Sequence, residues 1–194
     1  MGAVRLEKAR AQLAGRIALE VLWRPFEIHP EVPPAGLPLS SIGYEPAELA
    51  AMMEHLRRQA AAEGMDFAPR SPESLLVNTH RALAASVYAH NNEPERSEAF
   101  HNAVFRANFC ESLNIGDPAV LRELAAAAGL DVARMDAALE TGAADDALRD
   151  AAADAHRRNI TAVPAFVFGG SCVVVGAHPP AALVQAAERA VVPR

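Results

Sequence analysis

The run at residues 160–170, Ile-Thr-Ala-Val-Pro-Ala-Phe-Val-Phe-Gly-Gly, limits the possible folds more than any other part of the chain. An apolar stretch, Ala165–Phe168, is followed by a Gly-Gly pair and a second branched stretch, so the run predicts a β-hairpin. Proline cannot donate to a ladder and is confined to strand edges or to a strand's first residue, where Pro164 stands. The Val163–Pro164 bond is therefore a candidate for the cis form, although a trans proline at a strand start is the commoner arrangement.

Helices outnumber strands in the rest of the pattern. We expect helices over residues 3–13, 46–63, 79–90, 95–110, 118–128, 132–141, 143–158 and 180–190, with strands at 17–23, Ala165–Phe168 and 171–175. Residues 24–44 carry five prolines and two glycines, so they predict an extended loop without hydrogen-bonded elements. Trp23 and Phe26, at its start, are expected in the core.

Composition narrows the class of protein. The chain has 194 residues, of which 51% are hydrophobic, so it suits one domain with or without an inserted subdomain. No apolar run of about 18 residues occurs, so a membrane span is not expected. A net charge of −6 without a basic block argues against a nucleic-acid partner. No secretory signal is visible, and we expect a cytoplasmic protein.

Two cysteines and seven histidines are the candidates for reactive or metal-binding side chains. Cys110 and Cys172 are far apart and form neither a Cys-x-x-Cys nor a zinc spacing, so both are expected to be buried structural thiols. The histidines form no His-x-x-x-His or His-Glu-x-x-His arrangement, so no metal site is predicted.

Five segments, taken together and in order, resemble the DsbA family of thioredoxin-like proteins, most closely its FrnE-type and 2-hydroxychromene-2-carboxylate isomerase-type branch. They are Asn78-Thr79, Glu98-Ala99-Phe100-His101, Ile115-Gly116-Asp117-Pro118, and residues 21–30 and 159–180. The resemblance implies an α/β fold in which a thioredoxin-like sheet carries a large all-helical insertion. Residues 1–43 and 144–194 would then form the thioredoxin-like domain, and residues 44–143 the insertion.

The chain departs from this family at its beginning. The family starts with a strand and a Cys-x-x-Cys motif, and its first helix follows; residues 2–9 already resemble that helix. The first strand and the reactive motif are therefore missing. By resemblance this strand is central, between residues 17–23 and Ala165–Phe168. We expect the gap to be closed by direct pairing of these two segments or filled by another chain, which favours a homodimer.

The resemblance also implies where a substrate binds. Val163 and Pro164, with Ala162 before them, would form a substrate-binding loop that presents backbone groups to an extended thiol or to glutathione. Asn78 faces the substrate cavity in isomerase-like relatives, and capping of the following helix is an equal alternative. No catalytic residue is predicted, because no cysteine stands at the start of the first helix.

Three functions remain open at this stage. The first is a thiol–disulfide oxidoreductase of the DsbA family, incomplete or inactive in this chain, acting on a protein or small-molecule thiol or disulfide. The second is a glutathione-dependent isomerase or transferase, with glutathione as co-substrate and no other cofactor. The third is a redox-inert binding module.

Overall fold

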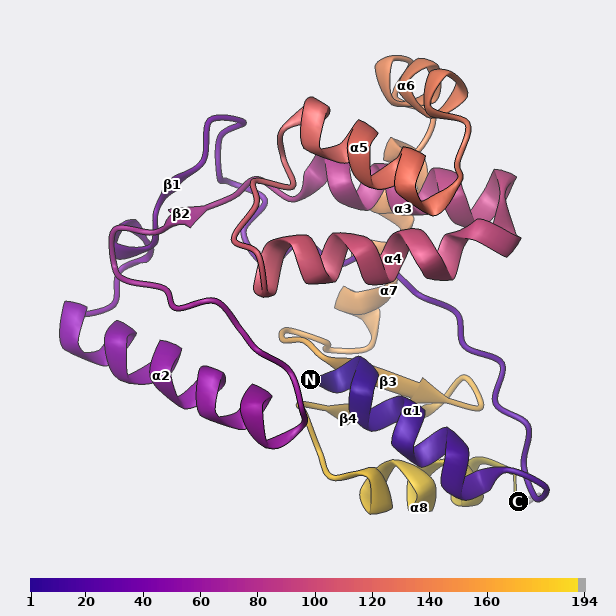
Figure 1. Cartoon of the computed structure of the whole chain (residues 1–194). Coiled ribbons are helices and arrows are strands. Elements are labelled where there is room, and N and C mark those ends of the chain that lie inside the picture. Colours follow the sequence, from indigo (N-terminus) through magenta and orange to yellow (C-terminus); the bar gives the residue numbers. More distant parts are fainter. Residues whose placement is uncertain (192–194) are drawn as a thin grey trace.

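The computed structural model describes residues 1–191, and helices make up most of it (Figure 1). The elements are α1 (Gly2–Leu13), β1 (Leu37–Pro38), the 3-10 helix η1 (Leu39–Ile42), α2 (Pro46–Ala62), β2 (Leu75–Leu76), α3 (His80–Asn92), α4 (Pro94–Phe109), α5 (Pro118–Ala128), α6 (Val132–Glu140), α7 (Asp145–Arg157), β3 (Ala165–Phe168), β4 (Cys172–Val175) and α8 (Pro180–Val191). Helices α2 to α6 fall within the range expected for the helical insertion.

Local capping sets several helix boundaries. The Asp117 carboxylate accepts a hydrogen bond from the Ala119 amide at 2.8 Å, Pro118 occupies the first turn of α5, and Gly129 ends that helix with a φ of 81°. The Asp131 carboxylate accepts a bond from the Arg134 amide at 3.1 Å and begins α6 in the same way. These boundaries confirm the sequence-based expectation for both helices.

The helical block has its own core, formed by α3, α4, α5 and α6 (Figure 1). Phe100 and Met135 are completely buried, and Leu121 is nearly so. Phe100, Val104 and Ala107 line one face of α4 at helical spacing, so this face supplies the core contact.

The thioredoxin-like part is built around the hairpin of β3 and β4, with Ala165 opposite Val175 and Phe168 opposite Cys172. Leu6 and Ala9 of α1 and Leu183 of α8 form a buried cluster on which Phe166, Phe168 and Val174 pack. Figure 1 shows α1 and α8 beside this hairpin, with the helical block above them.

The predicted strand at residues 17–23 is wrong, because no strand lies there. Residues 17–21 do alternate between partial burial and exposure, as in a strand, and Val21 packs on the cluster around Leu6. The sheets of residues 1–191 pair only β1 with β2 and β3 with β4, so the expected direct pairing of this segment with β3 is also absent. A segment with a strand-like pattern does not form a strand without a hydrogen-bonded neighbour.

The prediction that residues 24–44 form a loop without hydrogen-bonded elements is also wrong. Leu37 pairs with Leu76, and Pro38 with Leu75, in an antiparallel pair, and η1 follows directly. This pairing joins segments far apart in the sequence, so local patterns could not reveal it. Trp23 is not a core residue either, since 39% of it is exposed.

Within residues 1–191, no helix combines the length and the apolar character needed to cross a lipid bilayer.

Phe100→Ala tests whether the α4 core stabilises the fold. We expect it to lower the free energy of unfolding by about 3–5 kcal/mol, because it leaves a cavity in a closely packed core. Urea denaturation followed by circular dichroism measures this. Phe105→Ala, on the exposed side of the same helix, is the matched control and should cost about 1 kcal/mol or less. Equal losses from the two variants would contradict this view of the core.

Candidate functional site

The start of α1 lies directly against Pro164, and the Val163–Pro164 peptide bond is cis. A Cβ atom placed on Gly2 would lie 2.6 Å from Cβ and 2.7 Å from Cγ of Pro164, closer than nonbonded carbon atoms approach. Only glycine therefore fits without displacing the loop. The contact joins the amino-terminal end of α1, where backbone N–H groups lack helical partners, to the loop that precedes β3.

The hydrogen bonds of the hairpin leave one edge of β3 unpaired. The Gly176 amide donates to the Pro164 carbonyl at 2.7 Å, which makes these residues a hydrogen-bonded pair at the start of the ladder. Because such pairs alternate along antiparallel strands, the backbone groups of Ala165 and Val167 point away from β4. Among residues 1–191, no hydrogen bond from outside the hairpin reaches them. Val163, at the head of this edge, is 43% exposed.

The outer edge of β4 differs from this edge. His178 Nε2 lies 2.9 Å from the Val175 carbonyl oxygen and occupies an acceptor on that edge. Among residues 1–191, no side chain makes such a hydrogen bond to the outward backbone groups of β3, although edges open to solvent are commonly protected. Beside the Pro164 loop, therefore, β3 offers backbone donors and acceptors for an extended chain.

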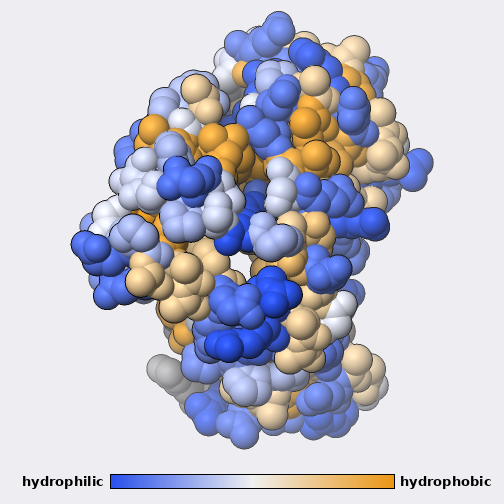
Figure 2. Space-filling view, turned by 60° about the vertical axis from the view of Figure 1, so that its left-hand side comes forward, coloured by the Kyte–Doolittle hydropathy of each residue, from blue (hydrophilic) through white to orange (hydrophobic). Residues whose placement is uncertain are grey.

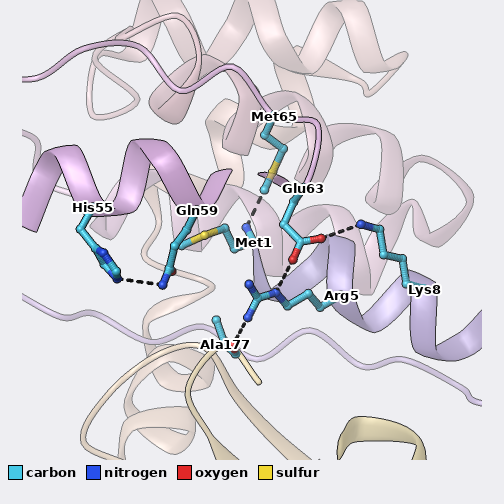
Figure 3. A network of polar contacts seen from close by, with 8 residues as sticks. All are labelled: Met1, Arg5, Lys8, His55, Gln59, Glu63, Met65 and Ala177. Atoms are coloured by element: carbon cyan, nitrogen blue, oxygen red, sulfur yellow. Dashed lines mark hydrogen bonds and ion pairs between the residues drawn. The ribbon is translucent and has the colours of Figure 1, made fainter. Parts of the chain in front are cut away.

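A polar network holds the first turns of α1 to the end of α2 and to the loop after β4 (Figure 3). Arg5 Nε donates to Glu63 Oε1 at 2.6 Å, and Lys8 Nζ donates to Glu63 Oε2 at 2.5 Å. Arg5 also donates through Nη1 to the Ala177 carbonyl. Arg5 and Glu63 are largely buried, with 16% and 13% of their side chains exposed. The network thus joins three segments that are distant in sequence.

Two hydrogen bonds lower the pKa of Glu63 below its ordinary value. The bond from Lys8 has the larger effect, and the bond from Arg5 the next largest. Both bonds need the ionised carboxylate, which explains the direction of the shift.

Neither cysteine belongs to α1. Cys110 follows the last residue of α4, Cys172 begins β4, and both are free and only partly buried, against the expectation of full burial. Met1 and Gly2 occupy the start of α1, where a thiolate would be stabilised by the unpaired amides. Within residues 1–191, no group of three His, Cys, Asp or Glu side chains could hold a metal ion.

The predicted site residues do not all come together. Ala162 and Val163 are exposed and lead into Pro164, so these three form one loop. Asn78 instead ties two loops together: its Nδ2 donates to the Val32 carbonyl at 2.5 Å, and its Oδ1 accepts from the His80 amide at 3.0 Å. Both polar ends of Asn78 are thus engaged within the chain.

Sequence reasoning missed a row of rings, which we call the aromatic ladder: Phe67, Phe109, Phe105, His101 and Trp23. Successive ring centroids are 5.1, 5.8, 4.5 and 4.1 Å apart. Burial lowers the pKa of His101 to about 4, so its ring is neutral near pH 7. The signal that could have revealed the ladder is the spacing of His101, Phe105 and Phe109, which recurs every four residues along the predicted helix.

The surface is hollowed between the helical block and the part below it (Figure 2). A separate cavity of about 260 Å³ lies between the loop after residue 24 and α7, and its walls include Phe26, Leu148 and His156. A smaller one of about 150 Å³ is lined by residues such as Arg70 and Leu113. Neither of these two cavities is lined by Val163, Pro164, Asn78 or the aromatic ladder. The candidate site is the unpaired edge of β3 beside Pro164.

Gly2→Ala tests the close contact with Pro164. We expect a loss of about 1–3 kcal/mol in the free energy of unfolding, because the added methyl group overpacks the interface. Ala11→Ser also adds one heavy atom to α1, but at an exposed position, and should change stability by about 0.5 kcal/mol or less. Chemical denaturation compares the two. A Gly2→Ala protein as stable as the parent would show that α1 does not press on this loop.

Glu63→Gln tests the network around Arg5. The folded-state pKa of Glu63 is lowered, so its stabilising contribution is present above the unfolded pKa of about 4.3 and is lost as the pH falls through the folded value. We expect a lower melting temperature for Glu63→Gln at pH 7 and a difference that shrinks below about pH 4. Glu54→Gln, in an exposed i,i+3 pair with Arg57, is the control and should have little effect. A difference independent of pH would contradict the assignment.

Comparison with known proteins agrees with this arrangement. The family model of the DSBA-like thioredoxin domain matches residues 1–188. The uncharacterized protein YwbO of Bacillus subtilis (strain 168) is 31% identical over 158 residues, which are 80% of this chain and 74% of that protein.

Two solved structures share the fold. A probable DsbA oxidoreductase from Streptomyces coelicolor superposes with a TM-score of 0.86 at 31% identity, over 97% of this chain and 82% of that one. A putative protein disulfide isomerase from Nitrosomonas europaea gives a TM-score of 0.69 at 19% identity, over 96% of this chain and 88% of that one. The resemblance seen in the sequence is thus confirmed: the chain belongs to the DsbA family of thioredoxin-like proteins, without the Cys-x-x-Cys motif.

Proposed function

We propose that this chain binds extended thiol- or disulfide-containing polypeptides at the Ala162–Val163–Pro164 loop and that it does not exchange disulfides by itself. Membership of a family of thiol–disulfide oxidoreductases supports the class of substrate. The observation that carries the proposal is the contact of Pro164 with Gly2 at the start of α1, beside an unpaired strand edge.

The binding step follows from the hydrogen bonds available at β3. An extended peptide beside this strand could donate to the carbonyls and accept from the amides of Ala165 and Val167, as an added strand does. Specificity would then come from side chains on either face, because successive residues of a strand point to opposite sides.

The chemical step lacks its nucleophile in this sequence. Disulfide exchange begins when a thiolate attacks a disulfide sulfur, and its rate depends on the position and pKa of that thiolate. Neither Cys110 nor Cys172 stands at the start of α1. We therefore propose a binding role for the chain alone, and exchange only where a reactive cysteine is supplied from outside it.

The glutathione-dependent alternative has less support. In the sequence-based hypothesis Asn78 faces a substrate cavity, but its two polar ends are bonded to Val32 and His80. Retention on glutathione-agarose would nevertheless reopen this alternative. The FrnE-type branch, a cytoplasmic location and a homodimer likewise stay predictions, the last of which light scattering can test.

The edge of β3 can be tested with a matched pair of proline variants. Val167→Pro removes an outward amide of β3, and Val173→Pro removes the equivalent outward amide of β4; neither removes a bond between the two strands. The probe is a decapeptide with one S-methylcysteine, which can dock but cannot exchange. We expect Val167→Pro to weaken binding about tenfold and Val173→Pro to leave it unchanged.

Two results would contradict the proposal. One is equal binding of the probe by both variants and the parent, measured by calorimetry. The other is turnover in an insulin-reduction assay, which should not exceed that of dithiothreitol alone. Turnover that disappears in Cys172→Ser would assign the reaction to that thiol instead.

A further inference from the structure

The smaller cavity, of about 150 Å³, contains a guanidinium group without a counter-ion. It lies where the segment around β2 meets the loop between α4 and α5 (Figure 1). Arg70 is half-buried there, and within residues 1–191 it forms no ion pair. Burial lowers the pKa of Arg70, and no neighbouring charge contributes to this shift. An arginine side chain stays protonated in proteins, so the cavity holds an uncompensated positive charge.

Only one nitrogen of this guanidinium is used within the chain. Arg70 Nη2 donates to the backbone carbonyl of Asn108 at 2.6 Å and to Asn108 Oδ1 at 3.0 Å. These two bonds fix the guanidinium to the end of α4. Among the described residues, its Nε and Nη1 atoms have no hydrogen-bond acceptor. Charged donors form the stronger class of hydrogen bond with anionic oxygens, so the unused N–H groups favour an anion.

The neutral polar side chains that line the cavity also have unused donors. Ser74 Oγ accepts from the Ser71 amide at 2.9 Å, and Asn114 Oδ1 accepts from the Gly116 amide at 3.0 Å. Within residues 1–191, the Ser74 hydroxyl hydrogen and Asn114 Nδ2 have no acceptor, and the Ser112 hydroxyl makes no hydrogen bond. The acceptors are therefore engaged while the donors are free, which favours a ligand that accepts hydrogen bonds.

The size and the walls of the cavity restrict the ligand further. Leu75, Val77 and Leu113 complete its lining, and such apolar surroundings strengthen the attraction between Arg70 and an anion. The volume equals that of roughly five water molecules at about 30 Å³ each. The cavity thus admits a group of the size of phosphate or sulfate, and any larger part of a ligand remains outside it.

We propose that this cavity binds a tetrahedral oxyanion, phosphate or sulfate, with Arg70 as its counter-ion. Ser74, Ser112 and Asn114 donate to the remaining oxygens. Donors from two separate segments surround the ligand, which suits a tetrahedral ion better than a planar carboxylate. The free ion and the phosphate group of a small ester share this chemistry. The site is separate from the proposed docking loop, because neither Val163 nor Pro164 lines it.

Calorimetric titration at constant ionic strength tests the class of ligand, in a buffer without phosphate or sulfate. We expect inorganic phosphate or sulfate to bind about tenfold more tightly than acetate, which has only two oxygens. O-phosphoserine is the ester probe. Tighter binding of this probe than of inorganic phosphate assigns the site to phosphate esters, and weaker binding assigns it to the free ion.

Variants test the residues. Arg70→Gln should weaken phosphate binding about tenfold or more, because it removes the charged donor. Arg58→Gln removes the same charge from an exposed position on α2 and should leave the affinity unchanged. Ser112→Ala should weaken binding about fivefold. It removes only an exposed hydroxyl, so it decides the question even if circular dichroism shows that Arg70→Gln does not fold.

Nuclear magnetic resonance locates the bound ion. Added phosphate should shift the Nε–H signal of Arg70 and the Nδ2 signals of Asn114. Three results overturn the site: no binding of phosphate or sulfate by the parent, an affinity that Arg70→Gln and Ser112→Ala leave unchanged, or shifts confined to residues outside the cavity. Acetate bound as tightly as phosphate overturns the tetrahedral ligand.

Discussion

The contact between the backbone of Gly2 and the ring of Pro164 is the constraint on which the rest of the candidate site depends. It fixes the beginning of α1 against the loop before β3. Arg5, one turn further along α1, can then donate to Glu63 and to the Ala177 carbonyl, which brings the end of α2 and the loop after β4 to the same place. One close approach, possible only for glycine, thus assembles four separate segments.

In the thioredoxin-like part, hydrophobic packing and strand pairing involve different segments. Its hairpin is stabilised on one face by α1 and α8, and the Phe166 and Phe168 rings pack on their buried side chains. Residues 17–23 contribute Val21 to that cluster but join no ladder. Hydrophobic packing therefore holds this segment in place without strand pairing, and among residues 1–191 the outer edge of β3 has no paired strand.

Local patterns predicted the helices and the hairpin well, because their hydrogen bonds join residues close in sequence. Asp117, Pro118 and Gly129 define α5 by capping rules, and the Gly-Gly pair after Phe168 defines the turn. The pairing of Leu37 with Leu76 could not be predicted in this way, because its partners are distant. In the site, Pro164 could be predicted from its position at the start of a strand. The roles of Glu63 and of the rings around His101 could not, because they depend on contacts between different elements.

By itself, the sequence determined the order of the elements, the family, and the lack of a paired cysteine motif at the start of α1. Only the tertiary structure decided that residues 17–23 are not a strand, that Asn78 is bonded within the chain, and that the side of α4 carrying Phe105 is exposed. The physical reason is the range of the interactions. A helix satisfies its backbone within four residues, whereas a strand, an ion pair or a row of stacked rings needs a partner that folding must bring from elsewhere.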